Sequence, residues 1–192
     1  MYLFFDVETN GLPRRSLSSS SNEVIQPRVV QLAFFRYSED GEEMSTYNEI
    51  VYPADFEIPW QVVRVHGITK KRALREGLPG SEVFAAFCAE AKLAKCLVAH
   101  NFAFDYPVVC AELNRYGLKN EIMNKEPVCT MRPKSVRDFC ELPRKNGGYK
   151  VPKLCELHEI LFGESFDGAH DAGADVRACA RCFFELKDRG IL

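Results

Sequence analysis

The chain has 192 residues, and its 25 Lys and Arg nearly balance its 27 Asp and Glu, for a formal net charge of −2. With 46% hydrophobic and 27% charged residues, the composition excludes wholesale disorder, and the near-neutral charge speaks against binding nucleic acid by bulk positive charge. No apolar run approaches the roughly 20 residues that span a bilayer, and the N-terminal segment lacks the basic start of a signal peptide. We therefore expect one domain over residues 1–192, intracellular (cytoplasmic or nuclear), with no membrane partner and with reduced cysteines.

Strand patterns dominate the first quarter of the chain. Residues 2–8 are apolar or aromatic apart from two carboxylates, which indicates a strand, and turn-forming residues at 10–13 end it. Residues 14–27 include a run of four serines and are expected to form a flexible surface excursion. Strands expected at 29–37 and 44–52 flank an Asp-Gly turn, which is typical of an antiparallel hairpin.

Helices and short strands alternate over the rest of the chain, an order that favours an α/β domain around one mixed sheet. No linker in this order indicates a second domain. Apolar spacing, caps and breakers predict helical pieces after residue 59, including one at 69–76, a helix at 81–94 capped by Ser81, a strand at 97–100, a helix at 102–116 ended by Gly117, a strand at 128–131, a helix at 152–162 and a last helix at 172–189.

Four carboxylates stand at positions where the local structure does not require them. Asp6 and Glu8 interrupt the first strand, and residues two apart in a strand project from the same face, where unpaired acids are costly to bury. Asp105 lies in the first turn of the helix after a buried strand, at the sheet end where α/β proteins place their sites. Asp175 lies in the last helix, five residues after His170 and among small residues. Each alone suits an edge strand or a helix dipole, and the arrangement becomes specific only when the separate segments are taken together.

The sequence resembles the DEDDh group of DnaQ-like 3′–5′ exonucleases in the order and spacing of three motifs. They are matched by Asp6-Val7-Glu8-Thr9-Asn10-Gly11-Leu12, by His100-Asn101-Phe102-Ala103-Phe104-Asp105 and by His170-Asp171-Ala172-Gly173-Ala174-Asp175, and the intervening His66-Gly67-Ile68-Thr69 resembles a further motif. The resemblance extends over almost the whole chain. It implies an RNase H-like α/β fold, with a mixed five-stranded sheet whose first three strands are antiparallel and which is flanked by helices.

The resemblance also implies two-metal phosphodiester hydrolysis. Four converging carboxylates repel one another without cations, and hard oxygen ligands suit Mg²⁺ or Mn²⁺. By this resemblance, Asp6, Glu8 and Asp175 hold the metal that binds the attacking water, Asp6 also contacts a second metal, and Asp105 reaches that metal directly or through water. His170 is the expected general base, because imidazole accepts a proton near neutral pH.

The substrate contacts that the resemblance implies come mainly from the first motif and its leucine, which hold the terminal nucleotide, and from a histidine against its base or sugar. Phe102 and Phe104 could stack on bases, although we expect at least one of them in the core. The candidate contacts are Thr9, Asn10, Gly11, Leu12, His66, Asn101 and Phe104.

Two basic stretches could meet the phosphates of a nucleic acid. Residues 60–75 carry five Lys or Arg and no acid, and residues 125–153 carry eight Lys or Arg against three acids. Residues 39–57 carry seven acids and no base, which is typical of a solvated hairpin away from the substrate. Two divalent cations would offset the four carboxylates, so the net charge of −2 does not exclude a nucleic-acid substrate.

The sequence therefore predicts a metal-dependent 3′–5′ exonuclease that acts on nucleic acid 3′ ends, with DNA favoured over RNA and single strands favoured, and that releases nucleoside 5′-monophosphates. Two alternatives keep the chemistry: an RNA-trimming exoribonuclease and a polymerase-associated proofreading exonuclease. The chain ends a few residues after its last helix, which favours a free-standing enzyme. A binding module that has lost activity is disfavoured, because all five expected catalytic residues are present. A polymerase or repair partner and a homodimer stay open.

Overall fold

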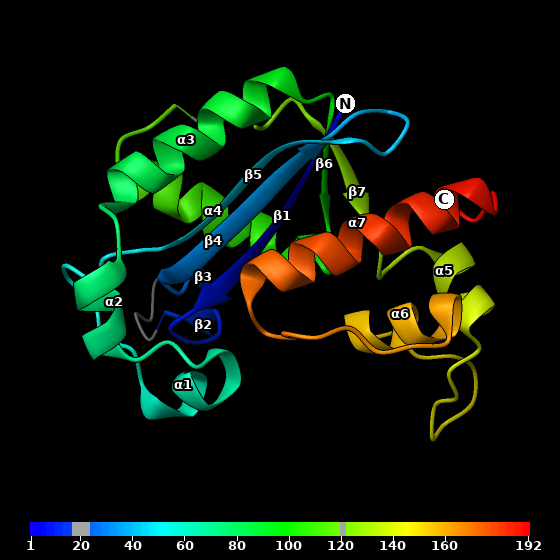
Figure 1. The fold of residues 1–192 in the computed structure, drawn as a ribbon. Helices are drawn as coiled ribbons and strands as arrows, with labels where there is room; N and C mark the ends of the chain where they lie inside the picture. Colours follow the sequence, from blue (N-terminus) through cyan, green and yellow to red (C-terminus); the bar gives the residue numbers. More distant parts are fainter. Residues whose placement is uncertain (17–23, 120–121) are drawn as a thin grey trace.

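The computed structural model describes residues 1–16, 24–119 and 122–192. Within these residues a five-stranded sheet forms the centre of the fold, with the strand order β5-β4-β1-β6-β7 (Figure 1). β4 pairs antiparallel with both β1 and β5, whereas β6 runs parallel to β1 and to β7. The predicted mixed sheet with three antiparallel strands is therefore confirmed. The strands are β1 (Tyr2–Thr9), β4 (Val29–Tyr37), β5 (Glu43–Ile50), β6 (Cys96–Ala99) and β7 (Glu126–Cys129).

Helices cover both faces of the sheet. α3 and α4 pack on one face and α7 packs on the other (Figure 1). α1 and α2 adjoin a smaller apolar cluster at the ends of β4 and β5, and α5 and α6 pack on the C-terminal half of α7. The helices are α1 (Trp60–His66), α2 (Lys70–Glu76), α3 (Gly80–Leu93), α4 (Phe102–Arg115), α5 (Lys134–Cys140), α6 (Leu154–Phe162) and α7 (Ala172–Asp188).

Alternation along β1 separates two hydrophobic layers. Leu3 and Phe5 belong to the cluster with α3 and α4, whereas Phe4 belongs to the cluster with α7. All three side chains are at most 1% exposed, and burying an apolar side chain of this size contributes about 1.5–3 kcal/mol. Because successive side chains alternate, Asp6 and Glu8 project from the same face as Phe4, toward α7. The sheet thus directs both acids to one side.

The expected surface excursion at 14–27 contains a short strand pair that was not predicted, and the predicted cap of α3 is wrong. Within the expected excursion at 14–27, Arg14–Arg15 (β2) pairs antiparallel with Val24–Ile25 (β3), while 17–23 lies outside the described residues. Ser81 does not cap α3, which begins at Gly80 after Pro79. A Cβ on Gly80 would lie 2.0 Å from the Tyr116 Oη. The start of α3 is therefore fixed by packing against the end of α4 rather than by a side-chain cap.

The other predicted elements are present, with boundaries that shift by at most two residues. α5 was not predicted; it has seven residues and no side-chain cap, so it lacks the signals that mark a helix in sequence. None of the helices in the described ranges is long and apolar enough to cross a bilayer.

Candidate active site

The first pair of acids is fixed by the central strand β1. β1 pairs with β6 only from Tyr2 to Phe4, and it continues to Thr9 beyond the end of β6. On this open side the backbone N–H of Val7, between Asp6 and Glu8, donates a hydrogen bond to Asp105 Oδ1 at 3.3 Å. Asp105 of the second motif thus accepts a backbone hydrogen bond from β1, the strand that carries the first motif.

Asp105 lies in the first turn of α4 and is 3% exposed. Asn101, which precedes α4, has a left-handed backbone with a φ of 76°, a conformation that is uncommon outside glycine and is best tolerated by Asn and Asp. This residue turns the chain sharply from β6 into α4, and the turn brings Asp105 back to β1.

The start of α7 supplies the remaining groups. The Asp171 N–H donates to the Gly168 carbonyl at 2.9 Å in a tight turn, and His170 has a left-handed φ of 71°. Asp171 then caps the helix, because its Oδ1 accepts the N–H groups of Gly173 and Ala174, both at 3.1 Å. The His170 backbone N–H donates to Asp175 Oδ2 at 3.2 Å. One turn of chain therefore fixes the position of both predicted residues.

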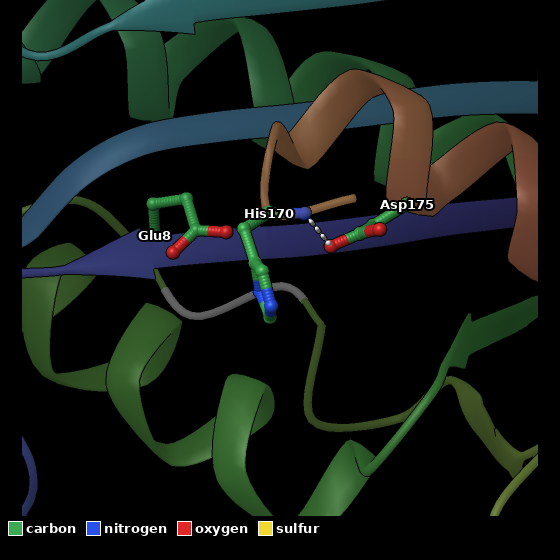
Figure 2. A group of neighbouring side chains, drawn as sticks. All are labelled: Glu8, His170 and Asp175. Carbon is green, nitrogen blue, oxygen red and sulfur yellow. Dashed lines mark hydrogen bonds between the residues drawn. The ribbon is translucent and has the colours of Figure 1, made fainter. Parts of the chain in front are cut away.

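Glu8, His170 and Asp175 meet at one point. Each offers a ligand atom, and these atoms all lie within 4.8 Å of one another. Figure 2 shows the carboxylates of Glu8 and Asp175 on either side of His170, whose ring projects away from α7. His170 is exposed, whereas both carboxylates are half-buried. The exposed imidazole therefore stands at the open side of the cluster.

Burial and mutual repulsion disfavour the charged forms of these acids. Loss of solvent, followed by the charges of Asp6 and Asp175, raises the pKa of Glu8 to about 9. Burial also raises the pKa of Asp175 to about 6, against the opposing effect of His170. The pKa values of Asp6 and Asp105 are likewise raised, first by burial. Cations at this point would relieve the repulsion.

The donor set suits a hard divalent metal. Asp6, Glu8, Asp105 and Asp175 offer carboxylate oxygens, which are the ligands that Mg²⁺ and Mn²⁺ prefer, and no thiolate competes in the group of neighbouring ligand atoms among the described residues. Bound cations would neutralise the repulsion between these carboxylates. The residues therefore fit a metal site.

A cleft of about 570 Å³ opens over the acidic cluster. It is bordered by all five predicted catalytic residues and by three of the predicted substrate contacts, Leu12, Asn101 and Phe104. Leu12 is 73% exposed, which leaves its side chain available to a ligand. Val151 to Cys155, which lead into α6 and include its first two residues, also border the cleft. A strand end could therefore lie between the first motif and α6.

Four other predicted contacts have partners within the protein and do not border this cleft. The Thr9 hydroxyl donates to the Gly11 carbonyl at 2.7 Å. The Asn10 side chain donates to the Glu57 carbonyl and accepts the Arg28 N–H, at 3.0 and 2.8 Å. His66 is buried, and its Nδ1 accepts the Ile68 N–H at 3.0 Å. These residues shape the loop beside the cleft.

The two phenylalanines of the second motif differ in whether they border the cleft. Phe102 packs edge-to-face on Phe5 and stacks on Tyr106, with ring centroids 5.7 and 5.0 Å apart. Phe104 borders the cleft. Both side chains pack against the hydrophobic cluster shared with α3, and of the two only Phe104 also borders the cleft.

His100 has a positioning role that the sequence did not indicate. Its Nδ1 lies 2.9 Å from the Thr130 hydroxyl and its Nε2 lies 3.2 Å from the Pro152 carbonyl. Burial lowers the pKa of His100 to about 4, so the ring is neutral near pH 7. Nε2–H then donates to Pro152, and Nδ1 accepts from Thr130. The ring thereby joins the end of β6 to the cleft wall before α6.

Gln31 is a second residue that the sequence did not indicate, and it contacts the start of α7. It lies on β4 directly across from Glu8 and is 4% exposed. Its amide donates to Asp171 Oδ2 at 2.8 Å and accepts from the Ala172 N–H at 3.3 Å. In the sequence it is only one polar residue within an apolar strand, so nothing marked its partners.

A twisted mixed sheet whose central strand ends among converging carboxylates defines the RNase H-like class of nuclease folds. The family described as RNase_T, Exonuclease, matches residues 3–183, and the chain belongs to this exonuclease family. The resemblance inferred from the three motifs is thus confirmed. Dependence on divalent metals is a property of the family.

Similar proteins of known identity agree with this assignment. Human Three prime repair exonuclease 2 is 27% identical to this chain over an alignment of 208 residues, gaps included. The alignment covers 95% of this chain and 81% of that protein. Crystal structures of E. coli exonuclease I share the fold. The complex with a dA16 oligonucleotide has a TM-score of 0.77, 20% identity and coverage of 98% of this chain. A zinc-bound complex with single-stranded DNA has a TM-score of 0.76, 21% identity and coverage of 98%. This chain spans only 41% and 40% of those two longer chains.

Proposed function

We propose that residues 1–192 form a 3′–5′ exonuclease domain that hydrolyses the terminal phosphodiester bond at single-stranded 3′ ends of DNA and releases nucleoside 5′-monophosphates. The observation that carries the proposal is the meeting of Glu8, His170 and Asp175 within 4.8 Å. Asp6 and Asp105 border the same cleft. Four carboxylates beside one exposed imidazole suit metal-assisted hydrolysis better than they suit binding alone.

The carboxylates of Asp6, Glu8, Asp105 and Asp175 would hold two divalent cations, Mg²⁺ or Mn²⁺. Their raised pKa values support this assignment, because a cluster that disfavours its own ionised form is neutralised by cations. When bound, such ions supply positive charge that stabilises the attacking and leaving oxygens of an in-line displacement. One strand and two helix starts carry the donors, so the set is fixed by three elements.

His170 is the proposed general base. Its imidazole takes a proton from the attacking water as the water oxygen bonds to phosphorus. The bond between phosphorus and the 3′ oxygen of the preceding nucleotide breaks, so the phosphate leaves with the terminal nucleotide, and the 3′ oxygen takes up a proton to become the new 3′ hydroxyl. The left-handed φ of 71° and the bond from the His170 N–H to Asp175 fix the main chain of His170. Only its side-chain torsions remain to adjust to the water.

Known relatives support DNA as the substrate. The similar human protein is named as a repair exonuclease, and E. coli exonuclease I has been crystallised with a dA16 oligonucleotide. In this chain, Leu12 and Phe104 place apolar surface at the cleft, which suits contact with a base. RNA is the alternative, and it depends on whether the cleft accepts a 2′-hydroxyl.

The test compares three substrates of the same sequence, each labelled at the 5′ end: single-stranded DNA, duplex DNA and RNA. In Mg²⁺ we expect single-stranded DNA to shorten fastest from its 3′ end, with release of 5′-mononucleotides, and we expect no hydrolysis in chelator. Faster shortening of RNA would replace the DNA assignment with the exoribonuclease alternative. An absence of hydrolysis on all three substrates would overturn the activity.

A further inference from the structure

The tryptophan of this chain lies on the surface. Trp60 is the only tryptophan in the sequence, and it is 63% exposed as the first residue of α1. Large aromatic side chains are usually well buried, because they remove much apolar area from water. The core contacts of α1 are made instead by Val62 and Val63, which pack on the cluster beneath. Packing within the described structure therefore does not explain this exposed ring.

An arginine already lies over the indole ring. The Arg64 guanidinium carbon is 5.6 Å from the ring centroid of Trp60, one helical turn away. Within the described residues Arg64 forms no ion pair, whereas nearby acids have basic partners: Glu57 contacts Lys70, and Glu76 contacts Arg72. Arg64 therefore keeps a positive charge for an external group, held beside an aromatic face.

This pair lies beside the loop that follows the first motif. Asn10, two residues past Glu8, donates its side-chain N–H to the Glu57 carbonyl at 3.0 Å. Trp60 follows Glu57 by three residues, so their Cα atoms are at most about 11 Å apart. Figure 1 shows α1 near the end of β1 and the strand pair β2–β3. The start of α1 is thus connected through Glu57 to the loop after β1, in which Leu12 borders the cleft.

We propose that Trp60 and Arg64 form a stacking platform for a nucleobase of the bound single strand, on the 5′ side of the nucleotide that is removed. This inference rests on the proposed exonuclease function and extends it to a second contact with the strand. Stacking on an aromatic face tolerates any base, because every base has a π-face. Arg64 would pair with a neighbouring phosphate. Charge complementarity favours a polyanionic strand here over a basic or neutral protein partner.

The single tryptophan makes the proposal directly measurable. Its fluorescence is followed while the wild-type chain, kept in chelator so that the strand persists, is titrated with a dinucleotide and with oligothymidylates of about 4–16 nucleotides, the span of typical single-strand sites. Anisotropy of a dye on each strand reports binding independently. We expect saturable quenching that appears only with the longer strands. Binding of the longer strands without any change in tryptophan fluorescence would overturn the platform.

Substitution supplies a second readout in Mg²⁺. Trp60→Ala should raise the KM for a long single strand by about tenfold to a hundredfold with little change in kcat, and Trp60→Phe should restore most of the loss. The control is Leu74→Ala, which truncates another exposed apolar side chain, 45% exposed on α2. A KM for Trp60→Ala equal to that of Leu74→Ala would overturn the platform while hydrolysis continues. If instead the wild type removes no nucleotides, the proposed function itself fails.

Discussion

Gln31 on β4 holds the N-terminus of α7 through Asp171. The Gln31 Nε2 donates to Asp171 Oδ2 at 2.8 Å, and its Oε1 accepts the Ala172 N–H at 3.3 Å. Gln31 is also the register partner of Glu8 across the β1–β4 pair. One amide side chain therefore links the helix that carries Asp175 to the strand next to Glu8, and so sets the distance between the two halves of the acidic site.

Replacing Gln31 with leucine should disturb both stability and turnover. The substitution leaves the Ala172 N–H and one Asp171 oxygen without their buried partner, which should cost about 1–3 kcal/mol in the free energy of unfolding. A shift of α7 against β1 should also lower kcat by about tenfold to a hundredfold. Urea unfolding and steady-state kinetics measure the two effects. Gln61→Leu makes the same change at an exposed position and should leave stability unchanged. Wild-type kcat in Gln31→Leu would show that this link does not set the geometry of the site.

The metal-free protein should lose stability as the pH rises. Folding raises the pKa of Glu8 from 4.5 to about 9 and that of Asp175 from 3.8 to about 6. A carboxyl group whose pKa is higher in the folded than in the unfolded state stabilises the folded state at pH values below its unfolded-state pKa. That stabilisation is lost as the pH rises through its folded-state pKa. In chelator, Tm should therefore fall between about pH 5 and pH 9.

Divalent metal should reverse this trend, because it binds the ionised carboxylates of the folded state and stabilises that state by mass action. Thermal melts with and without Mg²⁺ measure the effect, and Glu8→Gln supplies the control, since it should flatten the part of the curve near pH 9. A metal-free Tm that rises steadily over the same range would contradict the charge assignment at this site.

The ion pair between Arg28, which directly precedes β4, and the buried Glu112 of α4 should contribute strongly to stability. Glu112 is 1% exposed, and its Oε1 accepts from Arg28 Nε at 2.8 Å, from the Val29 N–H at 3.1 Å and from Arg115 at 3.0 Å. Glu112→Ala leaves buried donors without an acceptor and should cost about 3–5 kcal/mol in unfolding free energy.

The matched control for Glu112 is Glu76, whose pairs with Arg72 and Arg75 lie at the surface. Glu76→Ala should change stability very little, because solvent screens such pairs. Urea unfolding of the two variants side by side distinguishes these cases. Equal losses would mean that burial does not strengthen the pair of Glu112 with Arg28.

Much of the candidate site could be predicted from the sequence, because short sequence patterns mark the residues that form it. Asp6 and Glu8 interrupt an apolar strand, so the period of two predicts that both acids share one face. The resemblance to DnaQ-like exonucleases then implied that Asp105 and Asp175 meet them, and the structure brings all four to one cleft. The strand map was equally accessible, because turns and breakers separate the strands clearly.

The remaining parts depend on tertiary contacts that leave no local pattern. Gln31 and His100 act through partners more than 25 residues away, on Asp171 and on Thr130 and Pro152. His66 was expected beside the nucleotide, yet α1 packs so that its ring is buried. Sequence spacing identifies which residues share an element, but the packing of that element decides which of them reach the cleft.

The central claim is that the carboxylates from separate segments act together in hydrolysis, and the variants Asp6→Asn and Asp175→Asn test it most directly. Each is compared with the wild type for release of 5′-mononucleotides from a single-stranded DNA in Mg²⁺, with circular dichroism to verify folding. The wild type should shorten the strand from its 3′ end, and both variants should be folded and inactive. Unchanged metal-dependent hydrolysis by either folded variant would contradict the assignment.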